Sequence, residues 1–157
     1  MTARVSLIIR LGTALLAATL AEVGVWAAAA PRSFYSSFPG AGHAWVAADG
    51  PYNQHLVRDV GQLDLGFAVL LLTAALLADR RLVRAVLGAY LVPAVLHLAY
   101  HLGHLGLYDT TDAVGNVTSL SLAVALPVAL LGGDVVLGRR GALQRPGPPS
   151  DAGAPRP

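Results

Sequence analysis

Four long apolar stretches constrain the fold of this chain more than any other feature of its sequence. They lie at about residues 7–30, 62–78, 85–107 and 114–137, and each approaches the roughly 20 residues that a helix needs to cross a bilayer. Of the 157 residues, 55% are hydrophobic and 13% charged, so no length remains for a separate soluble catalytic domain. We therefore predict an all-α protein, a four-helix transmembrane bundle over residues 1–140. Its expected spans are about 7–30, 55–78, 85–107 and 114–137.

The basic residues are all arginine, and most of them lie at one predicted side of the membrane. They precede the first span, separate the second from the third, or follow the fourth (Arg4, Arg10, Arg80, Arg81, Arg84, Arg139, Arg140, Arg145, Arg156). Only Arg32 and Arg58 fall in the other connections. By the positive-inside rule, both termini are cytoplasmic and the 31–60 and 105–113 connections face outward in a multi-pass protein of the cell membrane. The basic pI of 9.4 therefore reflects topology in a lipid bilayer and indicates no nucleic-acid partner.

Three further features limit what the chain can be. It has no cysteine, which excludes disulfides, thiolate metal sites and thiol redox chemistry. Glu22 interrupts the first apolar run and Pro31 follows its alanine-rich end, so we expect an uncleaved span rather than a signal peptide. Residues 141–157 are rich in proline and glycine, and we expect a disordered cytoplasmic tail there.

Three histidines mark the outer half of the third predicted span. At about 100° per helical residue, His97, His101 and His104 fall within roughly 60° of arc, with Tyr100 beside them. Titratable side chains are costly at membrane depth and usually face a protein interior or a water-filled cavity. We therefore predict a functional site on this stripe.

The other predicted spans offer polar groups at the same level. The second helix carries a polar face (His55, Arg58, Asp59, Gln62), the first carries Glu22, and the fourth begins near Asn116. We predict that these residues and Tyr100 line an outward-facing pocket, with His55 or Asp59 approaching His101 or His104. Glu22 is expected to point inward and to close the cluster from below, because an unpaired carboxylate is costly at that depth. In the inner half, Asp134 is expected to be solvated or paired with arginine.

The histidine stripe allows several interpretations. His97, His101 and His104 can simply hydrogen-bond within the bundle, or they can line an open cavity for a small ligand or a proton path. They can also bind a transition metal, because neutral imidazole suits Zn, Cu or Fe. Haem fits less well, because its axial histidines usually come from two different helices.

Several segments resemble a known group of proteins. They are Phe38-Pro39-Gly40, the run from Gly50 to Gly61, Tyr100-His101-Leu102-Gly103-His104, and the run from Asp112 to Asn116. These segments are similar to small, uncharacterised actinobacterial four-helix integral membrane proteins. In architecture the whole chain resembles the DoxX-like class, some members of which are linked to membrane oxidoreductase complexes. The resemblance implies a four-span fold and supplies no catalytic residues.

Three functions remain open from the sequence. The leading hypothesis is a binding or accessory subunit with an outward-facing, histidine-rich polar pocket. The second is a metal- or haem-dependent membrane redox protein that uses the same histidines. The third is a structural subunit of a larger membrane complex, with a membrane protein or a second copy as its partner. The sequence does not decide whether the protein is an enzyme.

Overall fold

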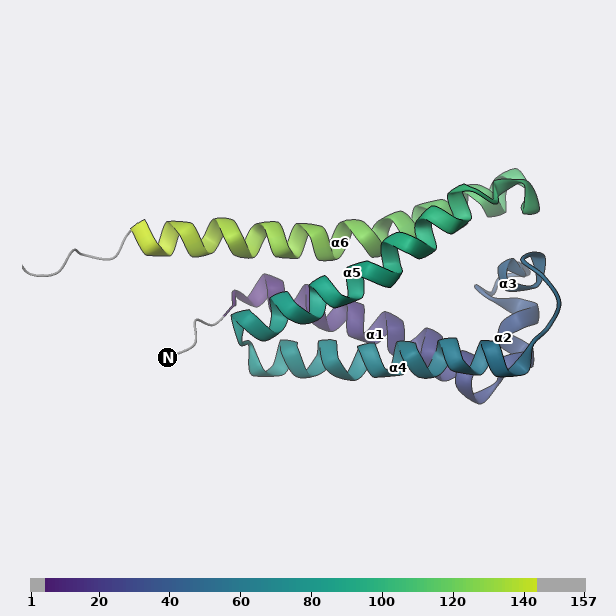
Figure 1. The fold of residues 1–157 in the computed structure, drawn as a ribbon, viewed down its shortest axis with the longest axis horizontal. Helices are drawn as coiled ribbons and strands as arrows, with labels where there is room; N and C mark the ends of the chain where they lie inside the picture. Colours follow the sequence, from purple (N-terminus) through teal and green to yellow (C-terminus); the bar gives the residue numbers. More distant parts are fainter. Residues whose placement is uncertain (1–4, 144–157) are drawn as a thin grey trace, which may run out of the picture.

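The computed structural model describes residues 5–143, which fold into helices and their connections (Figure 1). Their order is α1 (Leu7–Ala29), α2 (Pro31–Ser37), α3 (Trp45–Ala48), α4 (Gln54–Leu77), α5 (Arg80–Leu102), the short 3₁₀ helix η1 (Leu105–Leu107) and α6 (Thr110–Leu143). Four helices are long and apolar enough to cross a membrane: α1, α4, α5 and the Thr110–Val136 part of α6. The predicted all-α, four-helix fold is confirmed.

The boundaries of two helices, α5 and α6, differ from the predicted spans. The third span was expected over about 85–107, but α5 begins at Arg80 and ends at Leu102, where Gly103 follows. The fourth was expected to begin near residue 114, but α6 begins at Thr110 because Asp109 Oδ1 accepts a hydrogen bond from the Asp112 amide at 2.9 Å. Helix α6 also continues through residues 141–143, which were expected in the disordered tail. The rest of that tail, 144–157, lies outside the described residues.

Helices α1 and α4 form the most extensive helix pair in the described part of the chain. Two glycines permit their close approach. A Cβ atom on Gly24 would lie 2.8 Å from the Gly61 carbonyl oxygen, and a Cβ atom on Gly61 would lie 2.6 Å from the Ala28 amide nitrogen. Small residues at a helix contact allow the backbones to pack closely, which is how membrane helices associate without a hydrophobic driving force between them.

The main apolar core joins all four spans at one end of the bundle. It combines the first half of α1, the second half of α4, the first half of α5 and Leu130 of α6, and its centre includes the fully buried Leu71 and Leu87. Toward the other end, α5 diverges from α1 and α4 and lies beside the beginning of α6 (Figure 1). We call the end with the α4–α5 turn the arginine end, and the opposite end, where α1 ends and α4 begins, the histidine end.

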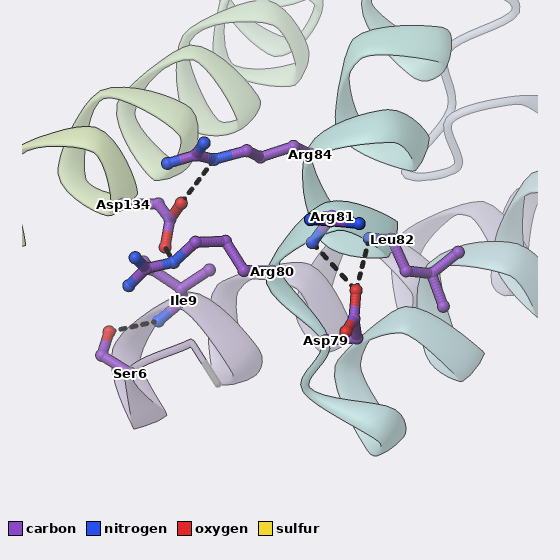
Figure 2. Close-up of polar contacts among 8 residues, drawn as sticks. All are labelled: Ser6, Ile9, Asp79, Arg80, Arg81, Leu82, Arg84 and Asp134. Atoms are coloured by element: carbon purple, nitrogen blue, oxygen red, sulfur yellow. Dashed lines mark hydrogen bonds and ion pairs between the residues drawn. The ribbon is translucent and has the colours of Figure 1, made fainter. Parts of the chain in front are cut away.

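The arginine end is fastened by a buried carboxylate. Asp134 of α6 is 1% exposed and pairs with two arginines of α5: the Arg80 Nε atom lies 3.0 Å from its Oδ1, and Arg84 Nε lies 2.7 Å from its Oδ2 (Figure 2). Both guanidinium groups reach from α5 toward the same carboxylate. The predicted pairing of Asp134 with arginine is confirmed, and the structure adds that this pair links α5 to α6.

Candidate functional site

Two histidines of α5 are in direct contact at the histidine end. The Nε2 atoms of His97 and His101 lie 2.9 Å apart, and their rings are stacked with centroids 4.8 Å apart. His101 is buried, with 8% of its surface exposed. Tyr90, one helical repeat below His97 on the same face, contacts Phe67 of α4 edge to face. The two histidines follow the face of α5 that carries Tyr90, and His101 is the buried member of the pair while His97 is exposed.

A short chain of hydrogen bonds leads from this pair to the loop between α1 and α4. The Tyr108 hydroxyl lies 3.2 Å from His101 Nδ1 and donates to the Trp45 carbonyl oxygen at 3.4 Å. The His97, His101 and Tyr108 side chains and the Trp45 carbonyl oxygen thus form one continuous hydrogen-bonded chain, in which the tautomer of each histidine sets which ring nitrogen donates.

The tyrosine in this chain is held in its protonated form. Burial raises the pKa of the Tyr108 hydroxyl, and the negative charge of Asp49, a further contribution from Tyr100 and the charge of Asp112 raise this pKa further. Tyr108 therefore remains a hydrogen-bond donor near neutral pH.

The loop between α1 and α4 covers this region through contacts with both α5 and α6. The Trp45 indole nitrogen donates to Asp112 Oδ1 at 3.0 Å, and His43 Nδ1 contacts the same carboxylate. Tyr100 donates its hydroxyl proton to Asp49 Oδ1 at 3.1 Å. These contacts tie residues 43–49 to the two helices that have diverged from α1 and α4.

Tight packing supports these polar contacts. The Trp45 ring lies against Gly115 of α6, where a Cβ atom would come within 2.9 Å of an indole carbon. Phe38 contacts the same ring edge to face, with centroids 6.1 Å apart. The position of the loop is therefore set by shape as well as by hydrogen bonds.

Four of the residues that build this cover were missed by the sequence prediction of the pocket: His43, Trp45, Asp49 and Asp112. The available signal was the composition of residues 34–45, where aromatic residues, glycine and a histidine occur together in one connection. A loop contact depends on the path of the chain, which helical periodicity does not describe.

The predicted stripe of three histidines is wrong at its third member. His104 lies beyond the end of α5, next to η1, where its ring stacks on Tyr100 with centroids 4.1 Å apart. Its Nδ1 lies 2.7 Å from the Tyr100 carbonyl oxygen, and the residue is exposed. Because α5 ends at Leu102, the helical spacing that would align His104 with His97 and His101 no longer applies.

The metal hypothesis gains no support from this geometry. Among residues 5–143, no group of three or more histidine, aspartate and glutamate side chains is arranged to hold a metal ion. His97 and His101 point at each other through the nitrogens that would otherwise bind a metal, and His104 lies apart from them.

The predicted meeting of the polar face of α4 with the histidines is also wrong. Helix α4 contacts α5 through Phe67, and at about 100° per residue His55 lies about 120° and Gln62 about 140° away from Phe67 around the helix. The His55, Arg58 and Gln62 side chains are exposed, and His55 pairs within its own helix with Asp59 at 3.3 Å. Apolar residues and glycine provide the helix contacts of α4, so its polar side faces away.

Glu22 and Asn116 have opposite surroundings. Glu22 is exposed on α1, and the ion pairs among the described residues do not include it, so the prediction that it points inward is wrong. Asn116 of α6 is only 4% exposed, and its side-chain oxygen is buried without a hydrogen-bond partner. Asn116 lies one helical turn from Asp112 and thus near the covered region.

Comparisons with protein-family models, with curated proteins and with solved structures found no match for this chain.

Proposed function

We propose that the protein is a cell-membrane binding or accessory subunit whose site is the histidine pair at its outward-facing end. The observation that carries this proposal is the continuous hydrogen-bonded chain from His97 through His101 and Tyr108 to the Trp45 carbonyl. Polar groups at membrane depth are costly and are typically functional. This chain also connects the pair to the loop between α1 and α4.

The arrangement is suited to binding a polar group and to exchanging a proton with it. A histidine in a hydrogen-bonded pair can accept a proton at one nitrogen and release one at the other. If both rings were protonated, both Nε2 atoms would carry hydrogens and the contact at 2.9 Å would be lost. Protonation of the pair therefore changes its structure, and the change can pass through Tyr108 to the loop.

Histidine-selective NMR of the protein in lipid nanodiscs tests whether the pair acts as one unit. We expect the resonances of His97 and His101 to titrate together, and Tyr108→Phe to shift both, because this change removes only the hydroxyl that joins His101 to the loop. His55→Gln is the matched control, since His55 lies on the far side of α4. Independent titration of the two histidines, unaffected by Tyr108→Phe, would contradict the proposal.

Native mass spectrometry from lipid vesicles tests the binding role. We expect the wild-type protein and His55→Gln to retain the same bound molecule or subunit, and the double variant His97→Gln/His101→Gln to lose it while keeping its helical content. Retention of the bound species by the double variant would show that the histidine pair is not the binding site.

A further inference from the structure

Asp64 is a carboxylate in the middle of a span, outside the site described above. It lies about 15 Å from the beginning of α4 and about 20 Å from its end, at 1.5 Å per residue. At about 100° per residue, it falls in the middle of the arc that the buried residues of α4 occupy (Val57, Gly61, Ala68, Leu71, Ala74, Ala75). Asp64 therefore faces the interior of the bundle, on the side opposite His55 and Gln62, and it is half-buried there.

The polar group that Asp64 faces on the next helix is Tyr90 of α5. Phe67, three residues along α4 from Asp64, packs edge to face against the Tyr90 ring, and the charge of Asp64 acts on the Tyr90 hydroxyl. Tyr90 is only 7% exposed. Among residues 5–143, neither its hydroxyl nor the Asp64 carboxylate takes part in a hydrogen bond or an ion pair. Because buried polar groups are costly without a partner, both need a hydrogen-bonding group that the described part of the chain does not supply.

The helices packed against α4 bring no arginine to Asp64. Helices α1, α2 and α5 contact α4. In α1, Arg10 donates to a backbone carbonyl of α4 at the arginine end, and Glu22 is exposed on the other side of the helix. In α2, Arg32 lies over an aromatic ring of the following loop. The arginines of α5 lie at the arginine end, so its groups near Asp64 that titrate are Tyr90 and the histidine pair.

The histidine pair lies farther along the face of α5 that carries Tyr90. Helices α4 and α5 run antiparallel (Figure 1), so Asp64 lies about 4.5 Å and His97 about 10.5 Å from the Phe67–Tyr90 contact, both toward the histidine end. The difference along the axes is about 6 Å, which bridging water molecules can span. Packing does not seal this stretch, because α5 diverges here and His97 is exposed. Toward the arginine end, in contrast, the core is apolar and fully buried.

We propose that Asp64 is a proton-binding site that is reached from the histidine end through the histidine pair. A proton from the outer solution protonates one imidazole of the pair. This imidazole gives a proton to the Asp64 carboxylate and becomes neutral again, so the net change is the uptake of one proton by one carboxylate. Chains of aspartate and histidine side chains within spans serve as proton relays in membrane proteins. The route rests on the proposed function, whereas the Asp64 site rests on its own surroundings in α4 and α5.

Infrared spectroscopy of the protein in lipid vesicles tests the Asp64 site, because a protonated carboxyl group has a C=O stretch that a carboxylate lacks. The buffer is acidified only to the range in which exposed aspartates stay ionised. We expect a C=O band in the wild type that Asp64→Asn removes. Asp59→Asn, the same change on the polar face of α4, should retain it. Tyr90→Phe keeps the ring contact with Phe67 and should shift the band.

Three results would overturn the site. They are the absence of a titrating C=O band in the wild type, a band that survives in Asp64→Asn, and a band that Asp59→Asn removes equally. A band whose position is unchanged in Tyr90→Phe would remove Tyr90 from the site. Circular dichroism of each variant verifies that its helical content is intact.

The rate at which the same band appears after a rapid drop in pH tests the route. We expect the double variant His97→Gln/His101→Gln to slow this rate by about 10-fold or more, because it removes the groups that relay the proton. His55→Gln, on the far side of α4, should leave the rate unchanged. An unchanged rate in the double variant would overturn the route, while the band itself would still support the Asp64 site. Independent titration of the two histidines by NMR would contradict the proposed function without removing this band, so the two failures are distinguishable.

Discussion

At the scale of single residues, the polar side chains of the spans differ in whether they have a partner. Asp134 is buried but lies between two guanidinium groups of α5, whereas Glu22 is exposed and has no such partner within residues 5–143. Asn116 keeps a buried oxygen without a hydrogen bond next to the covered histidine region. Asp134 thus has two close partners, whereas the side-chain oxygen of Asn116 has none among the described residues.

Replacement of Asp134 by asparagine should destabilise the protein. The change removes the charge that offsets Arg80 and Arg84, but these arginines are 24% and 43% exposed and can turn toward water. We therefore expect a loss of about 1–3 kcal/mol in the free energy of unfolding, measured by denaturation in detergent micelles. Arg81→Gln, at an exposed position beside the pair, is the control and should have little effect. An unaltered stability for Asp134→Asn would mean that the ion pairs do not fasten α6.

At the scale of helices, the small residues of α1 and α4 determine which helices pair. Sequence reasoning paired the polar face of α4 with the histidines of α5, because each face was too polar for lipid. The close approach at Gly24 and Gly61 instead joins α4 to α1, and α4 then presents Phe67 to α5. Close packing of backbones outweighs the pairing of polar faces, because polar residues in the first turns of α4 lie near the end of the span and can reach water.

Two glycines of α4 provide a matched test of this contact. Gly61→Ala should destabilise the protein by about 1–3 kcal/mol, because the new Cβ atom would meet the α1 backbone. A Cβ atom on Gly66, five residues along the same helix, meets nothing within 4 Å. Gly66→Ala should be neutral or stabilising by up to about 1 kcal/mol, because alanine favours helix. Thermal unfolding of both variants in the same lipid checks the difference, and equal effects would argue against a close α1–α4 contact.

At the scale of the whole molecule, the bundle is closed at the arginine end and divided at the histidine end. The core and the Asp134 ion pairs join all four spans at the first end. At the other, α5 and α6 diverge from α1 and α4, and residues 43–49 bridge them. The loop contacts with α5 and α6 therefore lie at the end that carries the histidines.

The orientation of the bundle in the membrane is a separate prediction. The arginine distribution predicts that the histidine end faces outward and that both termini are cytoplasmic. Reporter fusions at residue 47 and at the C-terminus should therefore give opposite signals, because the first lies in α3 at the histidine end. The same signal from both fusions would refute this topology.

The sequence by itself determined the architecture of the protein. Apolar runs long enough to cross a membrane form helices in lipid, because a helix satisfies each backbone polar group within its own segment. It also indicated that the histidines, Glu22, Asp59, Asp64 and Asn116 place the polar groups of the spans toward one end of the bundle and Asp134 toward the other, because charged and polar residues are rare in such runs. Those features are local, so the order and spacing of residues along the sequence are sufficient to predict them.

Only the tertiary structure decided which polar residues meet. The end of α5 at Leu102 separates His104 from the pair, and the path of the 31–53 loop brings Trp45 and Asp49 to α5 and α6. The close contact at Gly24 and Gly61 turned the polar face of α4 away and left Glu22 exposed. Helical periodicity gives the angle of a residue around its own axis. The rotation of that helix toward its neighbours is set by the shape of the whole packed surface, which no single segment contains.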